Sequence, residues 1–197
     1  MNDAQLSNAQ ASSIIEGTDA WTLENGYRNI LATIGISQDG KMRNIIGREA
    51  ERAVRDKLLQ WIKDVGIPCE QKGAWFELGA AKTVRMAYGS EPDIVFEKYD
   101  EQMQDWTLEV TIEIKGGMDP AGALERLGAI KKSIDQTPAR VENIAILGVV
   151  TSAMRAELDQ MRIVDFDLYD VVNSKEGWDR FTEELFYHKL RLLPWKN

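Results

Sequence analysis

The sequence contains one cysteine, Cys69, and one histidine in 197 residues, so it lacks the side chains from which disulfide frameworks and zinc centres are built. A single cysteine excludes an internal disulfide, and no CxxC pair or histidine cluster is present to bind zinc. Chains of this length normally bury enough apolar surface to fold without cross-links. We therefore expect one domain of ordinary size that suits a reducing compartment.

Long apolar runs are also missing. No segment is apolar over the length that a bilayer requires. The first residues, MNDAQLSNAQASS, have neither the basic start nor the apolar stretch of a signal peptide. We expect a soluble, cytoplasmic protein that has no membrane partner.

Positive charge is scarce, since 24 Lys and Arg stand against 32 Asp and Glu, which gives a net charge of −8. Phosphate binding relies on Lys and Arg, so this balance argues against a nucleic-acid partner. The objection weakens where acidic residues gather around divalent cations, because each bound metal ion adds two positive charges. Net charge alone therefore does not exclude a metal-dependent enzyme that acts on nucleic acid.

The apolar pattern divides residues 1–197, which we interpret as a single domain, into three parts. Residues 1–40 predict a helical arm, 42–150 a core, and 151–197 a helical segment that either completes the core or forms a dimer interface. Residues 42–65 predict the strongest helix, because apolar residues recur at helical spacing until Gly66-Ile67-Pro68 ends it.

Strands are predicted at residues 92–99, 106–115 and 143–150. The first two are close enough in sequence for an antiparallel hairpin, and a helix over residues 119–135 makes the third a parallel neighbour. Residues 70–90 contain two short β-like runs, AWFEL and KTVRMAY, in a hairpin or a mobile loop. This order predicts an α/β fold with a mixed β-sheet flanked by helices.

Strand 106–115, WTLEVTIEIK, carries the residues that suggest chemistry. Strict alternation places its side chains on two faces, with Leu108, Val110, Ile112 and Ile114 on one and Thr107, Glu109, Thr111, Glu113 and Lys115 on the other. Glu113 and Lys115 then lie side by side, and the hairpin brings Asp93 from the preceding strand beside them. The pair Gly116-Gly117 follows directly, where a backbone turns sharply or passes close to a phosphate.

Two carboxylates and a lysine in this arrangement suit phosphodiester hydrolysis. The reaction needs a water nucleophile, charge neutralisation and help for the leaving oxygen, which one or two Mg²⁺ ions supply. We predict that Asp93, Glu113 and the carbonyl of Ile114 bind Mg²⁺, for which Mn²⁺ can substitute, and that Lys115 orients or deprotonates the attacking water. An ExK triplet alone arises by chance on many half-exposed strands, so the argument needs Asp93 and the hairpin context as well.

The pattern resembles the PD-(D/E)xK nuclease superfamily, with Pro92-Asp93 as the PD element and Glu113-Ile114-Lys115 as the ExK element. The resemblance implies a restriction-endonuclease-like α/β/α core with metal ligands at Asp93 and Glu113 and a catalytic lysine at Lys115. Members often add a glutamate from the helix before the hairpin. We prefer Glu49, which borders the packed side, over Glu51, whose Arg55 at i+4 indicates a solvated ion pair.

Residues 114–134 also resemble the segment after the catalytic lysine in type II restriction enzymes of the XcyI kind. The matching positions are Gly116, Gly117, Asp119, Arg126, Lys132 and Ser133. The resemblance implies a Mg²⁺-dependent endodeoxyribonuclease that cleaves double-stranded DNA at a short palindromic, G/C-rich site. A palindrome has two equivalent scissile phosphates, so we expect a homodimer. The alternatives are a repair or recombination nuclease of the same superfamily, specific for DNA structure, and a non-enzymatic α/β interaction domain.

DNA contacts are expected from groups that flank the proposed metal site in sequence. Trp75 and Trp106 are candidates for stacking on bases or sugars, although buried aromatic residues are commoner. His188 has no role in this mechanism. The candidate DNA-binding residues are Lys72, Lys82, Arg85, Gly116, Gly117, Asp119, Arg126, Lys131 and Lys132.

Overall fold

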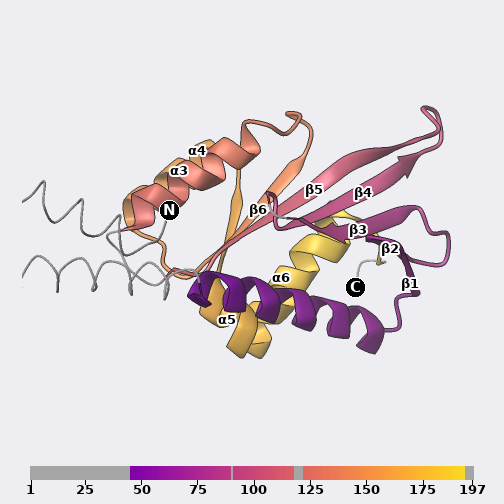
Figure 1. Ribbon diagram of the computed structural model, residues 1–197, viewed down its shortest axis with the longest axis horizontal. Coiled ribbons are helices and arrows are strands. Elements are labelled where there is room, and N and C mark those ends of the chain that lie inside the picture. Colours follow the sequence, from indigo (N-terminus) through magenta and orange to yellow (C-terminus); the bar gives the residue numbers. More distant parts are fainter. Residues whose placement is uncertain (1–44, 90, 118–121, 194–197) are drawn as a thin grey trace, which may run out of the picture. The chain divides into compact units, whose positions relative to one another are not determined.

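The computed structural model of the chain describes residues 45–89, 91–117 and 122–193. The chain divides into two compact units, residues 1–44 and 45–197, and all described residues belong to the second. A seven-stranded sheet with helices on both faces forms this second unit (Figure 1). The expected α/β fold is confirmed, whereas the expected N-terminal arm lies outside the described residues. No helix in the described ranges is long and apolar enough to cross a membrane.

The sheet has the order β1-β2-β3-β4-β5-β6-β7, so every strand pairs with its neighbours in the chain. The first five strands are antiparallel: β1 (Cys69–Lys72), β2 (Trp75–Leu78), β3 (Val84–Tyr88), β4 (Ile94–Asp100) and β5 (Asp105–Lys115). Two parallel strands follow: β6 (Glu142–Leu147) and β7 (Val164–Asp167). The predicted hairpin and the parallel third strand are confirmed, while β1 and β7 were not predicted.

Helices cover the two faces unequally (Figure 1). One face carries α3 (Ala123–Ile134), the predicted crossover, and α4 (Ser152–Gln160). The other face carries the helix of residues 45–64, α5 (Leu168–Asn173), α6 (Lys175–Glu183) and the π-helix η2 (Glu184–Lys189). The C-terminal segment completes the core, because Phe181, Leu185 and Phe186 are fully buried in its main cluster.

Helix 45–64 corresponds to the strongest helix of the sequence pattern. Its buried residues Ala50, Val54, Leu58 and Ile62 recur every fourth position and pack against the sheet. The helix ends at Asp64, and Gly66 in the turn that follows has a φ of 74°, in the left-handed region that glycine adopts without strain. This helix therefore presents one narrow apolar stripe to the sheet.

The strict alternation predicted for β5 is wrong at one place. Phe96 pairs with Val110, but Glu97 pairs with Leu108, so Glu109 is an extra residue in β5. A β-bulge of this kind reverses the facing of the residues before it, and Leu108 does not share the core face of Val110. From the bulge to its C-terminal end, β5 keeps an uninterrupted register with β6.

Glycines let the end of β5 approach helix 45–64 closely. A Cβ atom on Gly116 would lie 2.5 Å from the Ala50 Cβ and 3.1 Å from the Ile46 carbonyl oxygen. A Cβ atom on Gly148, which follows β6, would lie 2.8 Å from the carbonyl oxygens of Gly116 and Gly117. Close packing against the helix thus accounts for the glycine at position 116, which is buried.

Replacing Gly116 by Ala is expected to lower the free energy of unfolding by about 1–3 kcal/mol, because the new methyl group would overlap Ala50 and the helix backbone. Gly128→Ala in α3 is the matched control. A Cβ atom there meets nothing within 4 Å, and alanine is the better helix former, so stability should rise by up to about 1 kcal/mol. Urea unfolding followed by circular dichroism measures both, and a Gly116→Ala chain as stable as wild type would contradict the close approach.

Candidate active site

Asp93, Glu113 and Lys115 come together beside the C-terminal end of β5. Asp93 directly precedes β4, and antiparallel pairing places the start of β4 next to the end of β5. The Lys115 Nζ lies 2.7 Å from Glu113 Oε2 and 3.8 Å from Asp93 Oδ2. The structure therefore assembles the predicted two carboxylates and lysine into one group, which we call the acidic cluster.

The two carboxylates of the acidic cluster are almost entirely withdrawn from solvent, while Lys115 is partly exposed. Asp93 and Glu113 are each 2% exposed, and Asp93 Oδ2 accepts a hydrogen bond from the Ile114 N–H at 2.7 Å. Glu113 Oε1 is buried without a hydrogen-bond partner. Buried oxyanions are unfavourable unless they are paired, and one ammonium group faces two carboxylates here. The site therefore has the electrostatic character that attracts a further cation.

Burial also changes the protonation equilibria of the cluster. Burial is the largest cause that raises the pKa of Asp93 to about 7; the charges of Glu113 and Glu51 raise this pKa further, while the Ile114 N–H and the Lys115 ammonium lower it. For Lys115, burial lowers the pKa, but the hydrogen bond to Glu113 and the surrounding carboxylates outweigh it, so its pKa is raised. Lys115 is therefore an ammonium group at neutral pH.

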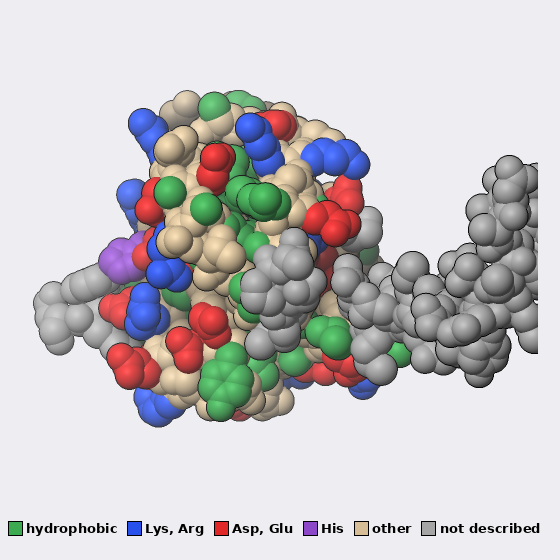
Figure 2. All heavy atoms as spheres, turned by 90° about the vertical axis from the view of Figure 1, so that its left-hand side faces the viewer, with side chains coloured by type: hydrophobic (Ala, Val, Ile, Leu, Met, Phe, Trp, Pro, Cys, Tyr) green, Lys and Arg blue, Asp and Glu red, His purple; other side chains and the backbone are tan. Residues whose placement is uncertain are grey.

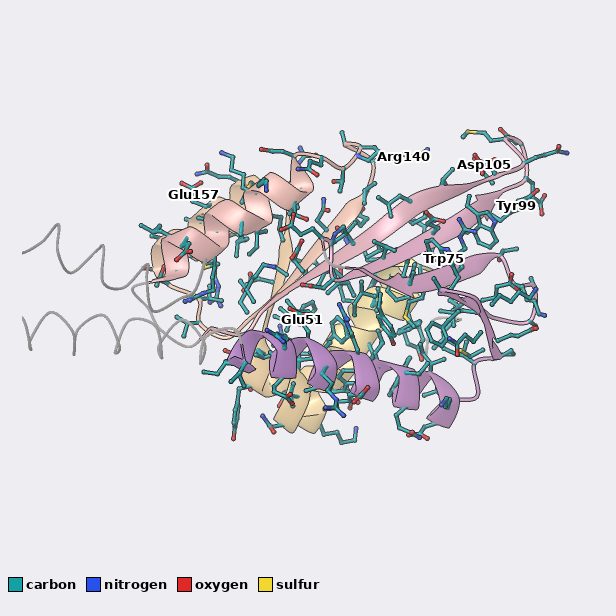
Figure 3. All side chains as sticks on the ribbon, viewed as in Figure 1. Glu51, Trp75, Tyr99, Asp105, Arg140 and Glu157 are labelled. Atoms are coloured by element: carbon teal, nitrogen blue, oxygen red, sulfur yellow. The ribbon has the colours of Figure 1, made fainter. Side chains whose placement is uncertain are left out.

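Glu51 joins the acidic cluster from helix 45–64. Its half-buried carboxylate acts electrostatically on both Asp93 and Lys115 and lies 3.7 Å from the Arg55 Nη2. Figure 3 shows Glu51 on the side of the helix that faces the sheet. Glu49 is exposed to solvent. The structure thus brings Glu51 to the cluster in place of the preferred Glu49, and the Glu51–Arg55 pair is half-buried where the sequence indicated a solvated pair.

The donor set of the acidic cluster suits a hard divalent cation. Asp93 and Glu113 offer carboxylate oxygens, one of which has no hydrogen-bond partner. Across the ranges that the structure describes, no group of three or more His, Cys, Asp or Glu side chains is arranged to bind a metal ion. A cation here would rely on the two carboxylates, a backbone carbonyl such as that of Ile114, and water, which is a common ligand set for Mg²⁺.

The predicted DNA-binding lysines of the antiparallel strands are paired with glutamates. Lys72 Nζ lies 2.8 Å from Glu77 Oε2, and Lys82 forms a salt bridge with Glu70. Both lysines are exposed. Exposed ion pairs of this kind contribute little to stability, so neither lysine is held firmly. Their charge is nevertheless balanced locally, and it does not form a basic surface.

Arg85, the third predicted DNA-binding cation of this region, is enclosed by aromatic rings. Its guanidinium carbon lies 4.1 Å from the centre of the Trp75 ring and 4.3 Å from that of Trp106. Its Nε donates to Glu97 Oε2 at 2.6 Å. The two tryptophans are half-buried. Their described contacts are those of a cation–π stack across the outer face of the antiparallel strands.

The candidates on the crossover helix differ in their distance from the acidic cluster. A Cβ atom on Gly117 would lie 2.7 Å from an Arg126 guanidinium nitrogen, so Arg126 lies against the segment that follows Lys115. Lys131 and Lys132 are exposed in the last turn of α3, about 8 Å further along the helix axis. Asp119 lies outside the described residues. Acidic and basic side chains are interspersed in Figure 2, wherever grey atoms do not cover this end of the molecule.

One family model matches the chain. Residues 9–185 match the model described as XcyI restriction endonuclease. The matched range contains all seven strands and the acidic cluster. No curated protein and no solved structure matches the chain.

Asp93→Asn is expected to stabilise the fold above neutral pH in a buffer without divalent cations. The pKa of Asp93 in the folded chain, about 7, lies above its ordinary value of 3.8. The folded state therefore binds more protons than the unfolded state between these values, and stability is lost as pH rises through them. At pH 8 the gain should be on the order of 1–4 kcal/mol, because a tenfold change in a proton equilibrium corresponds to about 1.4 kcal/mol.

Urea unfolding at pH values from about 4 to about 8 measures this effect, because this range spans the ordinary pKa of an aspartate and the raised pKa of Asp93. The matched control is Asp105→Asn, since Asp105 is exposed at the far end of the β4–β5 hairpin (Figure 3). If the free energies of unfolding of wild type and Asp93→Asn change with pH in the same way, the pKa of Asp93 is not raised by folding.

Proposed function

The chain belongs to the XcyI restriction endonuclease family, and on this premise we propose that it hydrolyses DNA at the acidic cluster with the help of Mg²⁺. Membership of this family makes it a type II restriction endonuclease, that is, a nuclease that acts on DNA. The observation that carries the choice of site is the buried pair of Asp93 and Glu113, both in contact with the Lys115 ammonium group.

In this proposal Asp93, Glu113 and the Ile114 carbonyl bind the metal ion. Mg²⁺ supplies charge neutralisation and a more acidic water molecule when it is bound. The Ile114 N–H fixes one Asp93 oxygen, which restricts the direction of the other. Glu51 takes the role of the additional glutamate because its charge reaches the cluster. Its contribution is electrostatic attraction of the cation.

Lys115 orients the attacking water and balances the charge that develops on the phosphate. The sequence left open whether this lysine orients or deprotonates the water. A lysine whose pKa is raised by neighbouring carboxylates holds its proton and donates hydrogen bonds, so its surroundings favour orientation. Its side chain is 23% exposed, whereas that of Glu113 is 2% exposed, so a phosphate that arrives from solvent can reach Lys115.

The proposed substrate is double-stranded DNA with a short palindromic, G/C-rich site, cleaved by a homodimer. A two-fold dimer presents one acidic cluster to each strand of a palindrome. The described part of the C-terminal segment fills the core, so we place the interface elsewhere on the chain. The restriction family favours this reading over a repair or recombination nuclease and over a non-enzymatic interaction domain.

Lys115→Met, Glu113→Gln and Asp93→Asn should each lower the Mg²⁺-dependent cleavage rate by about 10²–10⁴-fold, because the first removes the group that orients the water and the other two each remove a ligand of the proposed metal ion. The measurement is single-turnover cleavage of a supercoiled plasmid by the full-length chain. Lys98→Met is the matched control, since Lys98 is an exposed lysine on the partner strand β4. Full activity in any of the three site variants would refute the assigned site.

Digestion of a plasmid of mixed sequence should give discrete fragments whose ends, when sequenced, share one short palindrome. A dimer that cuts both strands in one encounter should produce linear DNA without accumulation of the nicked circle. A smear, or cleavage confined to branched DNA, would instead support the repair or recombination nuclease. No cleavage under any divalent cation would support the interaction domain.

A further inference from the structure

Arg55, on helix 45–64, lies against the connection from β3 to β4. Its Nη2 donates to the carbonyl oxygen of Gly89 at 2.8 Å and to that of Asp93 at 3.0 Å. The Gly89 N–H also donates to the Asp93 carbonyl oxygen, at 3.0 Å. The two ends of the connection are thus bonded to each other, and one guanidinium group fastens both ends to the helix.

Arg55 also faces the carboxylates of the acidic cluster. The same nitrogen lies 3.9 Å from Asp93 Oδ1 and 3.7 Å from Glu51 Oε2. The other Asp93 oxygen is held by the Ile114 N–H. Asp93 is therefore restrained from two sides, by the backbone of β5 and by the Arg55 side chain, and Arg55 connects it to Glu51.

The Arg55 side chain is itself restrained. Its guanidinium carbon lies 5.2 Å from the centre of the Tyr88 ring, and the Tyr88 hydroxyl donates to the Arg55 carbonyl oxygen at 3.3 Å. Its side chain is 24% exposed, and its Nε is buried without a hydrogen-bond partner. Buried polar groups are normally paired, so this side chain is held through its Nη2 hydrogen bonds to the β3–β4 connection and not through Nε.

Arg52 on the same helix forms a solvent-exposed ion pair, with which Arg55 can be compared. Its Nε lies 3.6 Å from Asp56 Oδ2, also at i+4, but the two side chains are 72% and 74% exposed. Exposed pairs of this kind contribute little. Arg52 and Arg55 are therefore each paired with an acidic residue four positions away, and among the described contacts only Arg55 also donates to the β3–β4 connection.

We propose that Arg55 is a positioning residue, which holds Asp93 in the direction that a divalent cation requires. This inference rests on the proposed function of the acidic cluster and deepens it. The Nη2 of Arg55 makes the contacts to both carbonyl oxygens and to Asp93, so a lysine ammonium could keep part of them, whereas a methionine side chain would keep none. Arg55 touches neither the cation nor the phosphate in this arrangement, and it acts through Asp93.

The test uses the full-length chain as wild type, Arg55→Met, Arg55→Lys and the control Arg52→Met. Mn²⁺ affinity is measured without DNA by electron paramagnetic resonance. The amide signal of Ile114 in a nitrogen–proton NMR spectrum reports whether Asp93 Oδ2 still accepts its hydrogen bond. Circular dichroism and urea unfolding establish that each variant is folded at the temperature of measurement.

We expect Arg55→Met to weaken Mn²⁺ binding by about 10–100-fold and to shift the Ile114 amide signal, because loss of a partner behind a metal ligand typically has this effect. Arg55→Lys should weaken binding less, and Arg52→Met should change neither quantity. If Arg55→Met does not fold, Arg55→Lys carries the test. Wild-type Mn²⁺ affinity in a folded Arg55 variant would overturn the proposal, whether or not its stability had fallen.

Asp93→Asn separates this inference from the proposed function. If Asp93→Asn loses Mn²⁺ binding and the Arg55 variants keep it, only the role of Arg55 is overturned. If wild type and Asp93→Asn bind Mn²⁺ equally, the proposed metal site is overturned, and the role of Arg55 falls with it.

Discussion

The burial of two carboxylates beside a single ammonium group is the constraint on which the rest of this structure depends. Asp93 and Glu113 are nearly inaccessible to water, and the Lys115 ammonium group contacts both of them. Such a group of charges costs folding free energy, so it persists only because surrounding elements hold it. The antiparallel pairing of β4 with β5 supplies the proximity, and the glycine after Lys115 lets helix 45–64 approach closely enough to add Arg55 and Glu51. The strand pairing and the glycine thus both contribute to the position of the buried carboxylates.

The same constraint explains why an acidic chain can belong to a family of DNA-cleaving enzymes. Part of the negative charge is concentrated where we propose that a cation binds, and the basic residues between the start of β1 and the end of β3 are balanced by glutamates of β1, β2 and β4. The net charge of −8 therefore describes neither the site nor the surface around it. Charge in this protein is organised in local groups, and a total cannot reveal such groups.

Sequence patterns predicted those parts of the fold that depend on local spacing. Helix 45–64, the β4–β5 hairpin, the crossover helix and the assembly of Asp93 with Glu113 and Lys115 all follow from periodicity, loop length and motif position. The short edge strands β1 and β7 carry too few residues for periodicity to separate them from loops. Glu49 and Glu51 flank the buried stripe at Ala50 on opposite sides of the helix, about 200° apart, so only the tertiary position of the β3–β4 connection decides which one reaches the cluster.

The bulge at Glu109 divides β5 into a distal half and a proximal half with different surroundings. The one extra residue exchanges the inner and outer faces of the distal half and leaves the alternation toward Lys115 intact. The distal half carries Trp106 and the stack around Arg85, and the proximal half carries the acidic cluster. An insertion or deletion on the distal side of the bulge would therefore leave the register of β5 with β6 beside the acidic cluster unchanged. A single strand thus contains two segments whose facings are set separately, and only one of them is tied to the geometry of the acidic cluster.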